Sequence, residues 1–278
     1  MISTGAYLSS LDPACKGALQ ALNERMRRYY LNREYHEDWV VGINTQWREG
    51  VHSAQLEMCR RIPQGASVVE IGCGDGSGAN EIKARVDCVK YMGTDLNWEL
   101  WRGKPGFVAT TAEFLPFPAS SVDVVLSMFV IEHLVFPATA LAEMWRILRP
   151  GGSLFIVAPD FDKNAMASER IGLRYGSGRQ KLAQWKLLDA FLTLYDSRMR
   201  LPLQRMRRRR RLQHGLCSFP ILTEPRCLSL QGFTVDCDAV YPVAPEEVVN
   251  YLSKQGEYQR NEIYYRDRST FGLQIVKN

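Results

Sequence analysis

The chain has 278 residues, of which 46% are hydrophobic, 10% aromatic and 23% charged. This composition is typical of a folded protein and excludes a small disulfide-stapled module or a wholly disordered chain. The formal net charge is +5, but eight arginines and no acidic residue lie between Arg198 and Arg211, and the remainder has 27 basic and 30 acidic residues, a net charge of −3. The charge therefore excludes a uniformly basic nucleic-acid-binding protein and indicates one local anion-binding patch.

Hydrophobic periodicity predicts helices within residues 1–66, including one that ends before Pro63. From residue 67, short β-branched runs alternate with helical segments. The predicted strands cover residues 68–71, 88–94, 107–110, 123–128 and 153–158, and the helices between them cover 77–85 and 137–148. This alternation predicts an α/β protein with a doubly wound, mostly parallel sheet.

The alternation stops between residues 160 and about 225, where helical patterning over 181–194 precedes the arginines. It resumes with a predicted strand over 233–241, a helix over 245–254 and a last strand over 270–276. The interruption is longer than an ordinary connection, which indicates a functional cap or lid. We therefore expect four regions, with boundaries at 1–66, 67–160, 161–230 and 231–278.

The cysteines and apolar segments bear on the cellular compartment. The seven cysteines are odd in number and include no CxxC pair, so neither a disulfide framework nor a zinc site is indicated. The first eleven residues have no secretory signal pattern, and the most apolar stretch, 124–136, is too short to span a bilayer. We expect a cytoplasmic protein with reduced thiols and no transmembrane segment.

A glycine-rich loop follows the first predicted strand. Gly72, Gly74, Gly76 and Gly78 allow the backbone to turn tightly and to approach a ligand closely. A P-loop is excluded because no Gly-Lys-Ser/Thr sequence follows this strand, and a dinucleotide fingerprint fits only in its looser form. An acidic residue two positions before the first glycine, Glu70, favours a third type of loop.

This segment resembles motif I of the class I S-adenosylmethionine-dependent methyltransferases. Further segments resemble that family in the same order along the chain: Asp95 at the end of the next strand, residues 112–125, residues 144–152 and residues 232–235. The resemblance implies a Rossmann-like, seven-stranded methyltransferase fold. It also implies N-terminal helices over the cofactor site, a helical arginine-rich cap, and C-terminal strands that complete the sheet. The cofactor would be S-adenosyl-L-methionine, and the product S-adenosyl-L-homocysteine.

The resemblance also implies which residues contact the methionine portion of the cofactor. Glu70 would receive its ammonium group, directly or through water. The remaining contacts would come from Gly72, Cys73, Gly74, Gly76 and Met128.

The ribose and adenine contacts are implied in the same way. Asp95 would accept the ribose hydroxyls, and Leu96 would pack on the adenine. Ala112 and Glu113 would line the adenine edge. Many relatives have an acidic residue where this chain has Thr111, so either Thr111 or Glu113 takes over that contact.

His133, just beyond the fourth predicted strand, is the candidate general base, with Glu132 beside it. The corresponding point of the family faces the transferred methyl group, and imidazole is suited to proton abstraction near neutral pH. The alternative is that both residues brace a helix. A metal-dependent RNA ribose methyltransferase has an additional glutamate where this chain has Phe129, so we expect no metal site.

Aromatic residues of the N-terminal region are a further candidate site. They shape a pocket near the sulfonium or simply pack on helices, and the sequence leaves both possibilities open. These residues are Tyr29, Tyr30, Tyr35, His36 and Trp47.

The run of arginines from 207 to 211 has three interpretations: a solvated surface, a site for a phosphate-bearing substrate or an anionic membrane surface, or an RNA-binding patch. No aromatic residue lies between Arg198 and Gln213, which disfavours single-stranded RNA. We therefore expect methyl transfer to a small molecule, glycan or isoprenoid-like metabolite, at an oxygen atom. The alternatives are an RNA methyltransferase and a non-catalytic partner subunit.

Overall fold

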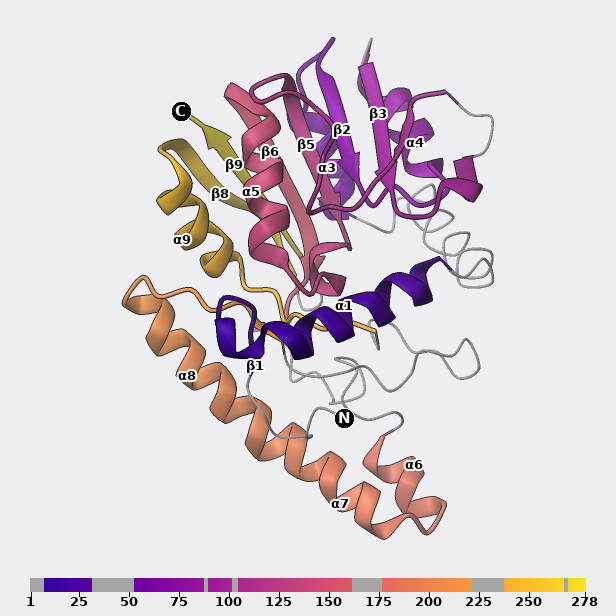
Figure 1. Cartoon of the computed structure of the whole chain (residues 1–278), viewed down its shortest axis with the longest axis vertical. Helices are drawn as coiled ribbons and strands as arrows, with labels where there is room; N and C mark the ends of the chain where they lie inside the picture. The colour runs from indigo at the N-terminus through magenta and orange to yellow at the C-terminus, as the bar shows by residue number, and fades with distance from the viewer. Residues whose placement is uncertain are drawn as a thin grey trace.

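The computed structural model describes residues 8–31, 53–87, 90–101, 105–161, 177–221, 238–267 and 270–278. Seven strands form one sheet in the order β4-β3-β2-β5-β6-β9-β8 (Figure 1). Its parallel strands are β2 (Ser67–Ile71), β3 (Lys90–Asp95), β4 (Phe107–Ala109), β5 (Val122–Met128) and β6 (Leu148–Pro159). Strands β9 (Thr270–Lys277) and β8 (Tyr258–Arg266) are antiparallel. The predicted mostly parallel α/β sheet is confirmed.

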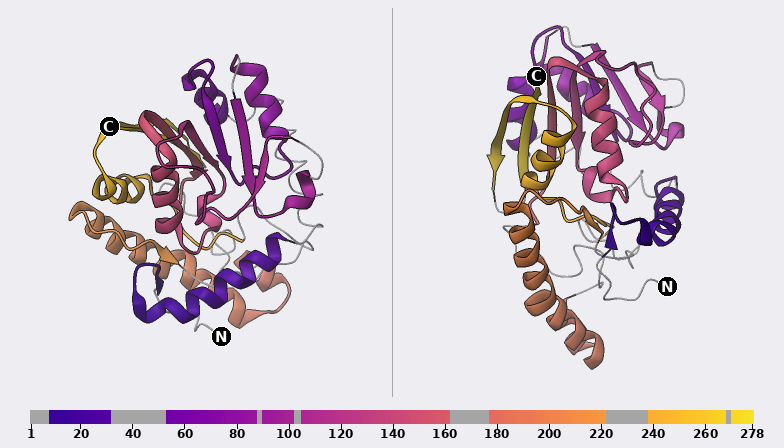
Figure 2. Two further views of the ribbon diagram at one scale, coloured as in Figure 1. Left: turned by 45° about the horizontal axis from the view of Figure 1, so that its top comes forward. Right: turned by 60° about the vertical axis from the view of Figure 1, so that its left-hand side comes forward.

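Helices cover both faces of this sheet (Figure 2). Because side chains alternate along a strand, Val124 and Leu126 of β5 pack on one side and Val125 on the other. The first side is covered by α3 (Ser53–Arg61) and α4 (Ser77–Arg85), and the second by α5 (Pro137–Ile147) and α9 (Pro245–Gln255). The helix predicted to end before Pro63 and the helices predicted over 77–85 and 137–148 are thereby confirmed.

Helix α1 (Lys16–Tyr30) lies across the end of the sheet where the parallel strands finish (Figure 1). Leu19, Leu22 and Met26 recur at helical spacing and are buried in the same core as α5 and α9. The side-chain amide of Asn97 donates to the carbonyl of Tyr30 at 3.5 Å, which joins the end of α1 to the segment after β3. Helix α1 is therefore placed beside the carboxyl edge of the sheet, where open α/β sheets bind ligands.

The strand predicted over 233–241 is wrong for its described part. Residues 238–241 are not a strand, because the N–H groups of Val240 and Tyr241 donate to the carbonyl of Glu132 and not to a sheet neighbour. The sixth strand of the sheet is instead β8, which the sequence did not predict. None of its residues is fully buried, because it lies at the sheet edge, and many of its side chains are polar, so the hydrophobic pattern of a buried strand is absent.

The single helix predicted over 181–194 is also corrected. Trp185 has a positive φ of 58°, and this left-handed residue separates α6 (Gly178–Ala183) from α7 (Leu187–Tyr195). A π-helical turn (Asp196–Arg200) then connects α7 to α8 (Leu201–Gln213) without a break. The result is one long helical rod that projects from the sheet body (Figure 2).

Two short elements complete the description. Strand β1 (Leu8–Ser9) pairs antiparallel with β7 (Pro220–Ile221), which joins the start of α1 to the segment after α8.

Within the part of the chain that the structure describes, no helix combines the length and the apolar composition needed to cross a membrane.

Candidate functional site

The glycine loop predicted from the sequence is the turn between β2 and α4. Gly72, Gly74 and Gly76 have φ values of +69°, +56° and +73°, a region that favours glycine. The N–H groups of Gly72 and Cys73 donate to the carbonyl of Thr94 at 2.7 and 3.0 Å, which holds the loop against the end of β3. The loop is therefore a tight turn of left-handed glycines that is fixed to the end of β3.

Asp95 connects this loop to the end of β3. One carboxylate oxygen accepts from the N–H of Gly74 and the other from the N–H of Asn97, both at 2.9 Å. A carboxylate has about four lone-pair sites, so these bonds orient it and leave capacity for ligand hydroxyls. Leu96, which follows it, is half-buried.

Glu70 lies buried on β2, directly before the loop. Its carboxylate accepts a hydrogen bond from the Tyr91 hydroxyl, a partner that the sequence analysis missed. Burial raises the pKa of Glu70 to about 7, although the bond from Tyr91 opposes this shift, and the nearby carboxylates of Asp95 and Asp75 raise it further. Glu70 can therefore change its charge near neutral pH.

The segment after β4 carries the residues predicted beside the adenine. The N–H of Thr110 donates to the carbonyl of Asp95 at 2.9 Å, so this segment starts next to the ribose candidate. Ala112 is buried, and Thr111 and Glu113 are half-buried.

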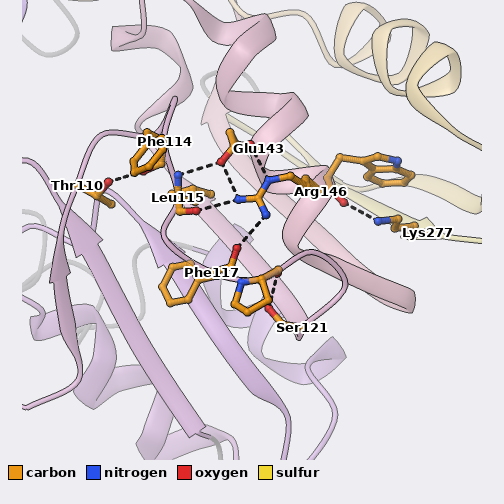
Figure 3. Close-up of polar contacts among 10 residues, drawn as sticks. Thr110, Phe114, Leu115, Phe117, Ser121, Glu143, Arg146 and Lys277 are labelled. Carbon is orange, nitrogen blue, oxygen red and sulfur yellow. Dashed lines mark hydrogen bonds and ion pairs between the residues drawn. The ribbon is translucent and has the colours of Figure 1, made fainter.

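Two side chains of α5 hold this segment in place, as Figure 3 shows. Glu143 accepts from the N–H of Leu115 at 3.0 Å, and Arg146 donates to the carbonyls of Leu115 and Phe117, each at 2.8 Å. Arg146 also donates to Glu143, so the two charged side chains brace each other. The sequence analysis assigned residues 144–152 to the family pattern but missed this function of the helix.

The segment after β5 contacts the glycine loop. A Cβ atom on Gly72 would lie only 2.4 Å from Cγ2 of Val130, so no other side chain fits between them without movement. Met128, at the end of β5, is half-buried, and a short 3-10 helix (Ile131–His133) follows. His133, the candidate base, is thus three residues after Val130, which packs against Gly72 of the candidate cofactor loop.

His133 is surrounded by two buried carboxylates and a tyrosine. Its Nδ1 lies 3.5 Å from Oδ2 of Asp238, and its Nε2 lies 3.8 Å from Oε1 of Glu132. The Tyr30 hydroxyl donates to Asp238 at 2.6 Å, and the Tyr30 and His133 rings lie edge to face with centroids 5.7 Å apart. The sequence analysis missed Asp238, and no local motif could have indicated it.

The other aromatic candidates have different outcomes. Tyr29 packs edge to face on Tyr30, with centroids 5.1 Å apart. Tyr35, His36 and Trp47 lie outside the described residues. Among the described residues, no group of three or more His, Cys, Asp and Glu side chains is arranged to hold a metal ion.

The residues at the carboxyl edge fit S-adenosylmethionine. The left-handed glycines form a tight turn at the carboxyl edge, Asp95 presents a carboxylate held by backbone N–H groups, and Glu70 is a buried acidic residue directly before the loop. Together with the doubly wound sheet, they define a class I, Rossmann-like cofactor-binding domain.

Comparison with known proteins identifies the kind of domain. Residues 69–156 match the family described as "Methyltransferase domain". The Pyrococcus horikoshii protein PH0226 has the same fold, with a TM-score of 0.50, 14% identity, and coverage of 90% of this chain and 99% of that protein. The chain therefore contains a class I S-adenosylmethionine-dependent methyltransferase domain, and the family implies S-adenosylmethionine as its cofactor.

Curated relatives match less than half of the chain. The phthiotriol/phenolphthiotriol dimycocerosates methyltransferase 1 of Mycobacterium ulcerans is 32% identical over 138 residues, which are 45% of this chain and 51% of the relative. The demethylmenaquinone methyltransferase of Deinococcus radiodurans is 31% identical over 127 residues, 42% and 51% of the two chains. The fatty-acid O-methyltransferase of Mycolicibacterium smegmatis is 31% identical over 138 residues, 44% and 50% of the two chains. The chain spans about half the length of these relatives.

Proposed function

We propose that this protein transfers the methyl group of S-adenosylmethionine to an oxygen atom of a small, lipid-like molecule, with His133 as the general base. The observation that carries the proposal is the placement of His133 beside Asp238 and Tyr30, adjacent to the glycine loop through Val130. A histidine that only braced a helix would not need partners from two distant segments, Tyr30 of α1 and Asp238 before α9.

The chemistry assigned to each residue follows from this placement. S-adenosylmethionine, when bound, supplies an electrophilic methyl group on a sulfonium. His133 would accept the proton of the acceptor hydroxyl as the new carbon–oxygen bond forms, while the methyl–sulfur bond breaks and S-adenosylhomocysteine leaves. The carboxylates of Asp238 and Glu132 stabilise the positive charge that the imidazole then acquires. Because both carboxylates are buried, water screens this stabilisation little.

In this proposal the methyl acceptor binds near Tyr30 and the cofactor near Asp95, and these two residues belong to connected segments. The Tyr30 hydroxyl bonds to Asp238, while its carbonyl accepts from Asn97, two residues after Asp95. Helix α1 thus connects the candidate base to the candidate ribose-binding residue. In this proposal residues 1–66 help to cover the cofactor, residues 67–160 and 231–278 supply the core, and residues 161–230 form the cap.

The substrate class is inferred from the relatives. Their names specify phthiotriol dimycocerosates, demethylmenaquinone and a fatty acid, all of them largely apolar molecules. Of these names, phthiotriol specifies hydroxyl groups, and a lipid-like acceptor with a hydroxyl group agrees with a proton-accepting histidine.

The direct test supplies the purified protein with a donor whose methyl group carries deuterium. Acceptors are demethylmenaquinone, a long-chain fatty acid and a total lipid extract, and mass spectrometry identifies the product. We expect a labelled ether or ester in a lipid fraction. Label bound to carbon or nitrogen would overturn the oxygen assignment, and label only in RNA would overturn the substrate class. Absence of S-adenosylhomocysteine binding would overturn the proposal as a whole.

A further inference from the structure

Helices α6, α7 and α8, here called the arm (residues 178–213), expose large apolar side chains to solvent. At the turn and in α7, Trp185 is 85% exposed, Leu188 72% and Phe191 64%. Along the rod the exposed apolar residues recur every three or four positions, which places them on one side of the helix. The six residues with this spacing are Leu188, Phe191, Tyr195, Met199, Leu203 and Met206, and the exposed Leu187 and Leu194 widen the apolar face in α7.

The same arm carries most of the excess positive charge of the chain. It contains eleven basic residues and two acidic ones. Consecutive helical residues are about 100° apart, so the run from Arg207 to Arg211 is distributed around the helix. Arg208 points into the body, where it contacts Glu247, while its four neighbours in the run are exposed. Arginines therefore flank the apolar stripe in α8.

The described contacts between the arm and the body lie in its α8 half. Besides Arg208, the carbonyl of Leu212 accepts from Asn250 of α9, and Leu201 is buried in the core. Helix α6 packs against α7, where Lys181 donates to the Thr193 hydroxyl at 2.7 Å. The end of the arm formed by α6 and α7 thus projects from the sheet body (Figure 2), and its large apolar side chains are exposed.

We propose that the arm binds the surface of an anionic lipid bilayer. A helix with Trp, Phe and Leu on one side and arginines beside them lies in the membrane interface, with the apolar side chains among the acyl chains and the guanidinium groups at the phosphates. The net positive charge of the arm complements anionic headgroups. Occupation by a second copy through a two-fold axis would bring two sets of arginines together.

This inference rests on the arm alone and not on methyl transfer. Its test therefore measures binding, not turnover. Full-length protein is sedimented with two kinds of vesicle. One contains phosphatidylcholine with about 30% phosphatidylglycerol, and the other contains phosphatidylcholine only. We expect binding to the anionic vesicles that weakens as salt is raised, and at least about tenfold weaker binding to the neutral ones.

Two triple variants separate the contributions. Trp185→Ser, Leu188→Ser and Phe191→Ser together should weaken vesicle binding by at least about tenfold, because apolar burial is lost. Arg207→Glu, Arg210→Glu and Arg211→Glu together should weaken it by at least about a hundredfold, since each basic residue near an anionic surface contributes about fivefold and each glutamate adds repulsion.

Matched controls are Ile263→Ser and Lys90→Glu, which change an exposed apolar residue and an exposed cation outside the arm. Both should bind as the wild type does, and all variants should keep S-adenosylhomocysteine affinity and the wild-type circular dichroism spectrum. Equal vesicle binding by wild type and both triple variants would overturn the proposal. So would a stable dimer that the apolar triple variant dissociates, or RNA binding that exceeds vesicle binding and is lost in the arginine variant.

Discussion

At the residue scale, the candidate catalytic site is assembled from side chains that are far apart in sequence. Tyr30 comes from α1, His133 from the segment after β5, and Asp238 from the segment before α9. The backbone of residues 240 and 241 is bonded to the carbonyl of Glu132, so the segment that carries Asp238 is fixed to the segment that carries His133. The orientation of the imidazole therefore depends on the complete fold.

Replacement of His133 with Gln should reduce kcat by roughly 10²- to 10⁴-fold, the usual contribution of a general base. The affinity for S-adenosylhomocysteine, measured by calorimetry, should remain within about twofold, because His133 is assigned no cofactor contact. Asp238→Asn keeps an acceptor for Tyr30 but removes the charge, so it should lower kcat with little change in KM for the cofactor, and Asp238→Glu should recover part of the loss. Wild-type turnover in His133→Gln would contradict the base assignment.

Because the pKa of Glu70 is raised, we expect the free energy of unfolding to depend on pH. Burial raises its folded pKa from 4.5 to about 7, so between these values the folded state binds more protons than the unfolded state. Its contribution is fully present below pH 4.5 and is lost as the pH rises through 7, a change on the order of 3 kcal/mol. In urea unfolding between pH 4.5 and 7.5, Glu70→Gln should flatten this slope relative to wild type. An unchanged slope would place the titration elsewhere.

Gly72 is a position where one added carbon atom should destabilise the protein. Gly72→Ala combines a left-handed φ of +69° with a contact of 2.4 Å to Val130, and should cost about 2–4 kcal/mol in unfolding free energy and abolish detectable S-adenosylhomocysteine binding. Gly65→Ala is the matched control, since its φ is +71° and nothing lies within 4 Å of the added carbon. Recovery of stability in Gly72→Ala/Val130→Ala would confirm the steric cause, and equal losses in the two single variants would contradict it.

Parts of this site could be predicted from the sequence. The glycines, Glu70 and Asp95 lie in one short stretch whose spacing has a direct chemical meaning. Tyr91 and Asp238 could not be predicted, because their importance arises from strand register and from a long-range packing contact.

At the element scale, the attachment of α8 to α9 is a buried ion pair. Arg208 contacts Glu247, the Tyr241 hydroxyl and the carbonyl of Pro242, and Glu247 accepts from the N–H groups of Ser218 and Phe219. Burial alone would raise the pKa of Glu247, but the charge of Arg208 and the N–H donors lower it overall. One arginine of the run is therefore structural.

Removal of one partner of this pair leaves a buried charge, so Arg208→Met should destabilise the protein by about 3–5 kcal/mol in denaturant unfolding. Arg207→Met, at the exposed neighbouring position, should change the free energy of unfolding by less than about 0.5 kcal/mol. Similar effects of the two substitutions would show that Arg208 does not support the joint between α8 and α9.

Elements that are buried in the core were predicted correctly from the sequence, and less buried elements were not. Strands β2 and β5 and helix α5 are surrounded by core, so their apolar patterns were read correctly. Strand β8 is exposed and polar, and was missed. The break at Trp185 was missed because a large aromatic residue gives no sequence indication of a left-handed backbone.

At the scale of the whole molecule, cofactor binding should be measurable as stability. At a ligand concentration of about one hundred times Kd, S-adenosylhomocysteine should add about 2.7 kcal/mol, which raises Tm by roughly 5–10 °C for a protein of this size. Asp95→Ala should abolish most of this increase in a thermal melt, whereas Glu99→Ala, nearby and exposed, should retain it. A full shift in Asp95→Ala would contradict the ribose assignment.

The arm and helix α1 lie on the same side of the sheet, the side where the parallel strands end (Figure 1). If the arm binds a bilayer and methyl transfer occurs as proposed, the candidate methyl-transfer site would lie at the end of the sheet nearest the lipid. An apolar acceptor then never has to dissolve in water to reach His133, and its search becomes diffusion within a plane. For such a substrate, turnover would depend on its density per area of membrane and not on its concentration per volume.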